Sequence, residues 1–140
     1  MPGRYELLIV TPARKVYQAM VGSLVAPGAD GYFGVLPRHA PMVAELATGE
    51  LSVLDDQAQR RLFALSGGFL EVGWDQVTIL ADTAEPAQEI EVPRAQQAQQ
   101  RAQARLRSRA ADVDVARAEA ALQRALNRLR IAEKRQQTSS

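Results

Sequence analysis

The sequence has no cysteine and a single histidine, His39, among its 140 residues. Without thiols the chain can form neither a disulfide framework nor a cysteine-based nucleophile or metal site, and one histidine excludes a histidine-rich metal centre. No run of about 18 apolar residues is present, so we expect no membrane-spanning helix. The first residues show no basic segment followed by an apolar one, so we expect no secretory signal there.

Aromatic residues make up only 5% of the chain and none follows Trp74, while all nine glycines precede residue 86. Charge changes at the same place. Residues 1–85 hold 6 Lys and Arg against 10 Asp and Glu, a net of −4, whereas residues 86–140 hold 11 against 6, a net of +5. The net charge of the whole chain is only +1, so we do not expect the chain as a whole to bind polyanions generally. This near-neutral value conceals the opposite charges of the two regions. We predict a domain over residues 1–85, a linker over 86–93 and a basic arm over 94–140.

The first region is typical of an antiparallel β-sandwich or barrel. It consists of short β-rich segments that end at Gly, Pro or Asp turns, and no helix-length pattern separates them. The segments are 5–11, 20–26, 32–36, 42–46, 51–54, 62–66, 69–72 and 77–81. Because parallel βαβ units need such a helix between strands, the pattern favours antiparallel pairing.

The second region has helical periodicity. Pro93 suits a first helical turn, where its missing N–H costs nothing, and Asp112 or Asp114 can cap a second helix. The apolar stripes comprise Ala95, Ala98, Ala102 and Leu106, then Val115, Ala118, Leu122, Leu126 and Leu129. We predict an antiparallel helical hairpin after the sandwich, an α+β fold. The alanines bury little area, so the hairpin should close weakly.

The motifs of common active sites are absent from the sequence. There is no GxxxxGK[ST] phosphate loop and no GxSxG nucleophile elbow. His39 lies between two prolines, where a structural or interface role is the usual one, and Asp55–Asp56 is typical of a solvated turn. We therefore expect no catalytic residues and no metal site.

Arginines recur at helical spacing in the second region. One stripe comprises Arg94, Arg101 and Arg105, and another comprises Arg117, Arg124, Arg128 and Arg135. Such stripes are often solvated faces, but arginine also binds carboxylates and phosphates through its planar, permanently charged group. The region has no aromatic residue for base stacking, so we do not expect nucleic acid as the partner. A solvated face and an anion-binding face both remain open.

Three segments resemble the epsilon subunit family of bacterial F-type ATP synthases. APGADGYFGVLPRHAP at 26–41 is similar to the signature loop of that family. SGGFLEV at 66–72, followed by VTILA at 77–81, is similar to its second block. RAEAAL at 117–122, continuing to RLR at 128–130, resembles its C-terminal helix. The resemblance extends from about Tyr5 to Glu133.

The resemblance implies a ten-stranded β-sandwich with a helical hairpin, in a non-catalytic subunit of the rotor. The implied partners are the gamma subunit, the c-ring and, for an extended arm, the alpha/beta catalytic head. The implied contacts to gamma and the c-ring are Asp30, Tyr32, Phe33, Arg38, His39 and Met42. The implied location is peripheral, on the cytoplasmic face of the bacterial inner membrane.

The resemblance also implies a regulatory arm. Extended along gamma, the arm inhibits ATP hydrolysis, and Arg117, Arg124, Arg128 and Arg135 contact an acidic segment of the beta subunits. Some bacterial members bind ATP at the folded hairpin through an Ile/Leu-Asp-x-x-Arg-Ala motif, which here reads IEVPRA at 90–95, with Glu91 in place of Asp. The implied nucleotide contacts are Glu85, Ile90, Glu91, Arg94, Ala95, Arg101, Arg117, Arg124 and Arg128.

We expect no required cofactor, with ATP as a possible regulatory ligand and no hydrolysis of its own. The alternative for the nucleotide residues is that they only hold the hairpin on the sandwich. The alternative for the whole chain is a freestanding adaptor whose basic arm binds a polyanion.

Overall fold

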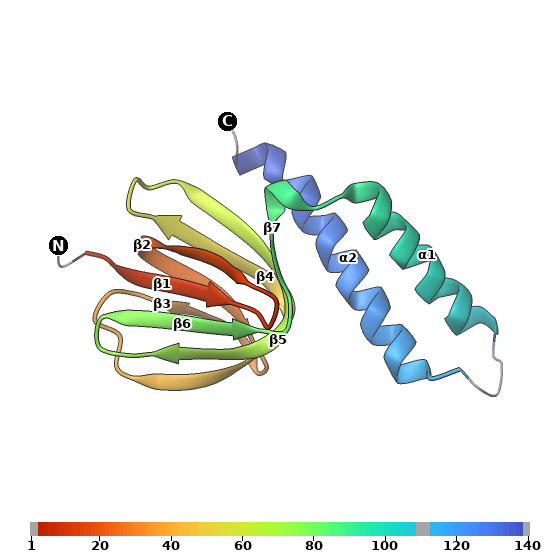
Figure 1. Ribbon diagram of the computed structural model, residues 1–140, viewed down its shortest axis with the longest axis horizontal. Coiled ribbons are helices and arrows are strands. Elements are labelled where there is room, and N and C mark those ends of the chain that lie inside the picture. The colour runs from red at the N-terminus through yellow and green to blue at the C-terminus, as the bar shows by residue number, and fades with distance from the viewer. Residues whose placement is uncertain (1–2, 109–112, 139–140) are drawn as a thin grey trace.

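The computed structural model describes residues 3–108 and 113–138. It consists of a β-domain and two long helices that lie side by side at one end of that domain (Figure 1). The strands are β1 (Tyr5–Val10), β2 (Lys15–Gly28), β3 (Gly31–Val35), β4 (Met42–Asp55), β5 (Arg60–Val72), β6 (Gln76–Ala81) and β7 (Ala84–Pro86). A 3-10 turn, η1 (Ala87–Glu89), leads into α1 (Val92–Ser108) and α2 (Val115–Thr138). The expected β-sandwich with a C-terminal helical hairpin is confirmed.

The sheet closes on itself. Its strand order is β1-β6-β5-β4-β2-β3, and β1 also pairs with β2. The pairings are antiparallel, as expected, except that β1 and β6 run parallel over Glu6–Val10 and Gln76–Leu80. The sequence analysis did not predict this pair, because it expected parallel strands only where a helix separates them. Here the intervening chain consists of strands β2 to β5, so no such helix is needed.

Strands β2, β4 and β5 are longer than predicted, because each bends from one layer of the sandwich to the other. In β5 the positions that belong to the sandwich core change parity, from Phe63 and Leu65 to Leu70 and Val72. The change falls at Gly67 and Gly68, whose φ angles of 88° and 123° suit glycine. β2 and β4 also have register irregularities or parity changes. The described residues form seven strands, fewer than the ten that the resemblance implied.

Alternating strand residues fill the sandwich core, in which Leu7, Ile9, Leu70 and Ile79 are fully buried. The β4–β5 turn is held by Asp55, whose Oδ1 accepts the N–H groups of Gln59 and Gln57, each at 2.9 Å. These hydrogen bonds, that from Gln59 foremost, and the Arg61 guanidinium lower the pKa of Asp55 against the opposing effect of burial. The turn is therefore stabilised at neutral pH, and this contribution is lost as the pH falls through the lowered pKa.

The helices begin and end largely where the sequence predicts. Pro93 lies in the first turn of α1. Asp114 caps α2, with its Oδ1 accepting the Arg117 N–H at 3.0 Å. Asp112, the other expected cap, lies outside the described residues. One stripe residue was predicted wrongly: Val115 is 55% exposed, because it lies at the far end of the hairpin from the sandwich.

Helix α2 lies between α1 and the β-domain (Figure 1). Its small residues Ala118 and Ala125 are buried, as are Ala95 and Ala102 of α1, so the two helices approach closely. The C-terminal half of α2 packs against β5 and η1. Among the described residues, neither helix is both long enough and apolar enough to cross a membrane.

Candidate functional site

The junction between the helical arm and the sandwich is a small, separate apolar core. Ile131 is fully buried at its centre, and Ala132 lies beside it. The surrounding residues come from β5, the β7–α1 connection and the start of α1: Leu62, Ala64, Ala87, Ile90 and, partly buried, Val92. Among the described residues, the core of the sandwich contains none from either helix. The arm is therefore an attachment to a domain that is already complete.

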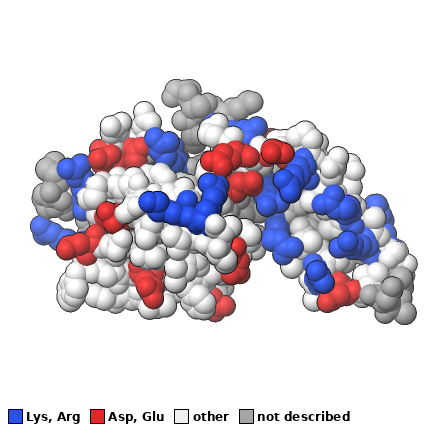
Figure 2. All heavy atoms as spheres, in the orientation of Figure 1, with Lys and Arg blue, Asp and Glu red and all other residues white. Residues whose placement is uncertain are grey.

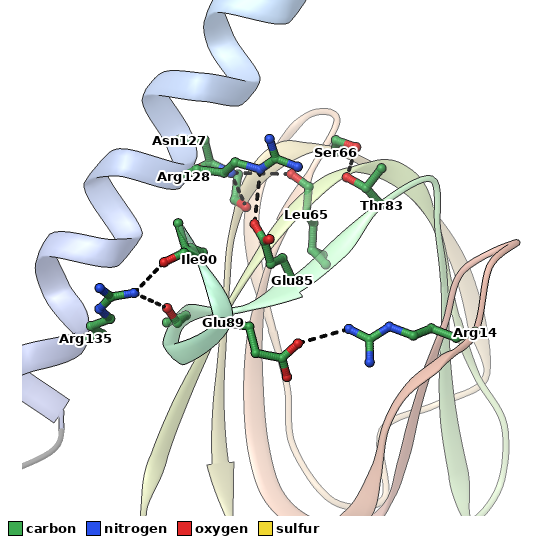
Figure 3. A network of polar contacts seen from close by, with 12 residues as sticks. Arg14, Leu65, Ser66, Thr83, Glu85, Glu89, Ile90, Asn127, Arg128 and Arg135 are labelled. Atoms are coloured by element: carbon green, nitrogen blue, oxygen red, sulfur yellow. Dashed lines mark hydrogen bonds and ion pairs between the residues drawn. The ribbon is translucent and has the colours of Figure 1, made fainter. Parts of the chain in front are cut away.

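Polar contacts surround this junction (Figure 3). The Arg135 Nη1 donates to the carbonyl oxygens of Ala87 and Ile90, at 3.0 and 2.8 Å. Asn127, only 2% exposed, donates from Nδ2 to the Gly49 carbonyl oxygen at 2.9 Å. Lys134 pairs with Glu50 at 3.0 Å. These contacts fix the arm in one position, since the buried amide would otherwise be unsatisfied.

Neither Asn127 nor Lys134 was predicted as a contact. The sequence signal for Asn127 was a polar residue among the apolar positions of α2, which can indicate a buried hydrogen bond. Its partner could not be inferred, because Gly49 lies 78 positions away and contributes a backbone carbonyl.

Six of the nine residues expected to bind nucleotide line one cavity of about 150 Å³ beside the junction. The lining residues are Glu85, Ile90, Glu91, Arg94, Ala95 and Arg128. Arg128 Nε lies 3.1 Å from Glu85 Oε1 and forms an ion pair with it. That oxygen is enclosed, yet it accepts no hydrogen bond. The cavity thus offers two carboxylates, Glu85 and Glu91, and two guanidinium groups, Arg94 and Arg128, a pattern suited to a ligand that carries both N–H groups and negative charge.

The other expected nucleotide residues lie outside this cavity. Arg124 is adjacent, lining a hollow of about 50 Å³ together with Asn127 and Arg128. Arg101 is exposed on α1, about 10 Å along the helix from Arg94. Arg117 lies at the far end of the hairpin, beside Arg105 and Asp114.

Basic side chains gather over the arm, whereas acidic ones are spread over the sandwich and its border with the helices (Figure 2). Of the four arginines expected to contact beta, Arg117 and Arg124 are exposed, and Arg128 and Arg135 are half-buried at the junction. The two half-buried arginines therefore hold the docked arm on the sandwich in this structure.

The residues expected to contact gamma and the c-ring occupy two loops of the sandwich. Asp30 and Tyr32 are exposed beside the β2–β3 turn, and Phe33 is half-buried against the core. They border an open hollow of about 540 Å³ formed by residues 28–33 and 43–45. Arg38, with a φ of 67°, and His39 lie in the β3–β4 connection, ahead of Met42 at the start of β4.

An exposed apolar row, Val43, Phe69 and Leu80, crosses the outer face of the sandwich. These side chains are 66%, 51% and 45% exposed. Phe69 lies opposite Leu80 in register, and Val43 is diagonal to Phe69 on β4. The row was not predicted as a contact surface. Its signal is an apolar residue at the outward position of an alternating strand, as in Phe69-Leu70-Glu71-Val72.

Comparison with known proteins gives matches over both regions. The ATP synthase delta/epsilon chain beta-sandwich domain matches residues 4–87, and the long alpha-helix domain of the same chains matches residues 88–133. The ATP synthase epsilon chain of Moorella thermoacetica is 53% identical over 104 residues, which cover 74% of this chain and 78% of that one. The epsilon chain of Syntrophobacter fumaroxidans is 50% identical over 106 residues, covering 76% and 78%.

A solved structure of an ATP synthase supports the same family. A chain in the Euglena gracilis mitochondrial ATP synthase, resolved with OSCP, F1 and the c-ring, superposes with a TM-score of 0.75 at 27% identity, covering 88% of this chain and 78% of that one. The protein therefore belongs to the ATP synthase delta/epsilon family, as an epsilon-type, non-catalytic subunit of the central stalk. The match of both regions to one family favours this assignment over a freestanding adaptor.

Proposed function

We propose that the sandwich couples the gamma subunit to the c-ring, and that the helical arm inhibits ATP hydrolysis when it leaves the sandwich. The observation that carries the proposal is the independence of the two cores. In the part of the chain that the structure describes, the sandwich core has 17 buried residues, none of them from the arm, and the junction core has 6. A small interface of this kind can open without unfolding the domain, as a two-state switch requires.

The coupling role uses two surfaces of the sandwich. The exposed row Val43, Phe69 and Leu80 is suited to an apolar partner surface, and we assign it to gamma together with the loop carrying Arg38, His39 and Met42. The hollow beside Asp30 and Tyr32 is suited to the polar loops of the c-ring. This arrangement would place the protein peripherally, on the cytoplasmic face of the bacterial inner membrane.

The inhibitory role belongs to the arm. Released helices would carry the exposed Arg117 and Arg124, together with Arg128 and Arg135, toward an acidic segment of the beta subunits. Because exposed charges are screened by salt, the resulting inhibition should weaken as ionic strength rises.

The test is ATP hydrolysis by an epsilon-free head of alpha, beta and gamma subunits. The whole chain should bind the head and inhibit hydrolysis. A chain ending at Val92 should bind equally, because it retains the sandwich core, but should not inhibit. Loss of gamma binding in the shortened chain would contradict the division of roles, and inhibition by the shortened chain would contradict the assignment to the arm.

We also propose ATP as a regulatory ligand of the docked arm. The Glu85 and Glu91 carboxylates that line the cavity can accept hydrogen bonds, and Arg94 and Arg128 can bind phosphate oxygens. A cavity of about 150 Å³ is smaller than a typical site for a whole nucleotide, so part of the ligand would lie over the exposed arginines of α1. A ligand that binds only the docked form shifts the population away from the released one.

Arg94→Ala is expected to lower the affinity for ATP about tenfold, since it removes a charge-assisted contact. Titration calorimetry on the full chain measures this. Arg107→Ala, which removes an exposed arginine at the other end of α1, is the matched control and should bind ATP like the unmodified chain. Equal affinities in all three proteins would favour the alternative that these residues only hold the hairpin on the sandwich.

A further inference from the structure

We infer that Tyr32, in the hollow assigned to the c-ring, positions the helical arm through a single peptide group that it shares with Asn127. The inference rests on the proposed arm release. It adds the residue through which the ring-facing surface influences that release.

The peptide group joins Gly49 to Glu50 on β4. On one side, the N–H of Glu50 donates to the Tyr32 hydroxyl oxygen at 3.1 Å. On the other, the carbonyl oxygen of Gly49 accepts the Asn127 Nδ2 at 2.9 Å. The N–H and the C=O belong to the same amide plane, so the hydroxyl of β3 and the side-chain amide of α2 bind opposite ends of one dipole. Hydrogen bonds linked in this way polarise one another, and each favours the other.

The packing around Gly49 makes this arrangement specific. A Cβ atom at Gly49 would lie 2.7 Å from the Tyr32 hydroxyl and 2.6 Å from the Pro27 Cβ. The glycine therefore allows the phenol to rest directly over the strand. Asn127 is 2% exposed, and its Nδ2 also lies 3.5 Å from the Leu65 carbonyl oxygen, while its Oδ1 accepts from Arg130 Nη2 at 3.5 Å. The amide is therefore held by several partners at once.

The same short stretch of β4 holds the arm a second time. The side chain of Glu50 pairs with Lys134 at 3.0 Å, about two turns of α2 beyond Asn127. The backbone of residues 49–50 is thus fixed by β3 on one side and by α2 on the other. A displacement of this backbone changes the docking of the arm directly.

Tyr32 is accessible to a partner while it holds this backbone. Its side chain is 61% exposed, although its hydroxyl is bonded to Glu50. A partner that draws the ring of Tyr32 out of the hollow removes the acceptor of the Glu50 N–H and weakens the Asn127 contact. By linkage, release of the arm loosens Tyr32 to the same extent. Contact at the ring-facing hollow and docking of the arm are therefore coupled.

A double-mutant cycle on the full chain tests this coupling. The readout is hydrogen exchange of the α2 amides and of the Glu50 amide. In the unmodified background, Tyr32→Phe should raise exchange in α2 by about two- to tenfold, the effect of one lost hydrogen bond. In the Asn127→Ala background the same change should raise it less than about twofold, because the contact through which Tyr32 acts is already gone.

Two controls separate this effect from a general loss of structure. Lys134→Gln removes the side-chain ion pair on Glu50 but leaves the shared peptide group intact, so its effect should add to that of Tyr32→Phe. Tyr17→Phe removes a hydroxyl from a half-buried tyrosine elsewhere in the sandwich, which packs on Phe63 at a centroid distance of 5.2 Å, and should leave exchange in α2 unchanged. Tyr32→Phe should lower the denaturant midpoint of the sandwich by the same small amount in both backgrounds, because the hydrogen bond between the Tyr32 hydroxyl and the Glu50 N–H is lost in each.

Equal effects of Tyr32→Phe in the two backgrounds, or no effect in either, would overturn the inference. Neither result would bear on inhibition, which the hydrolysis assay measures with unsubstituted chains. Conversely, non-additive exchange in a chain that fails to inhibit would support the coupling and contradict the proposed function of the arm.

Discussion

Substitution of Ile131 with alanine is expected to release the helical arm from the sandwich. Ile131 is fully buried at the centre of the junction core, between Leu62 of β5 and Ala87 of η1. Truncation of a buried isoleucine costs about 2–5 kcal/mol, through lost transfer free energy and the cavity left behind. Here the loss falls on the docking of the arm, because the sandwich core does not include this residue.

Hydrogen exchange should show this as faster exchange throughout α2, with unchanged protection in β1 and β6. Val115→Ala, on the same helix but 55% exposed, is the matched control and should change the stability of docking by less than about 0.5 kcal/mol. The released arm should also make the Ile131→Ala chain a stronger inhibitor of hydrolysis. Simultaneous loss of protection in the sandwich would show that the two cores are not independent.

Gly68→Ala is expected to destabilise the sandwich itself by about 3 kcal/mol or more, an effect typical of overpacking and backbone strain. Gly68 has a φ of 123° at the bend of β5. An added Cβ would overlap the carbonyl oxygen of Leu80 and lie 2.8 Å from the Ala81 Cα. Both atoms belong to the backbone of β6, which is paired with Gly68 and cannot move without breaking the sheet.

Denaturation with guanidinium chloride measures the loss, and Gly31→Ala separates its two causes. Gly31 has a similar φ of 132°, but an added Cβ there would meet nothing within 4 Å. Its substitution should cost about 1–2 kcal/mol, for the backbone conformation alone. An equal loss of stability in the two variants would mean that contact with β6 contributes nothing at Gly68.

Most of the fold could be predicted from local patterns. Turn residues separated the strands, and a change in composition near residue 86 marked the start of the helical region. The bends were missed because Gly67–Gly68 is a turn signal in the sequence, whereas in the structure β5 continues through these glycines from one layer to the other. A positive φ allows both outcomes, and only the pairing of Gly68 with Ala81 decides between them.

The candidate site was predictable only in part, from residues adjacent in the chain and from the family resemblance. The residues of IEVPRA come together because they are adjacent in the chain, and a family resemblance identified their distant neighbours Glu85 and Arg128. Helical spacing alone grouped Arg117 with Arg128, but these residues are about 16 Å apart along α2. Periodicity shows which residues share a face of a helix and not which part of that face meets the sandwich.

The sequence by itself determined the division into a glycine-rich β-domain and a basic, alanine-rich arm, because turn chemistry, strand alternation and helical period are local properties. The tertiary structure alone decided how the two are joined. The docking of Ile131 in its small core, the enclosure of the Glu85 oxygen and the peptide group between Tyr32 and Asn127 all depend on atoms far apart in the chain. The last of these features is a backbone group, which every residue carries, so no side-chain pattern could have revealed it.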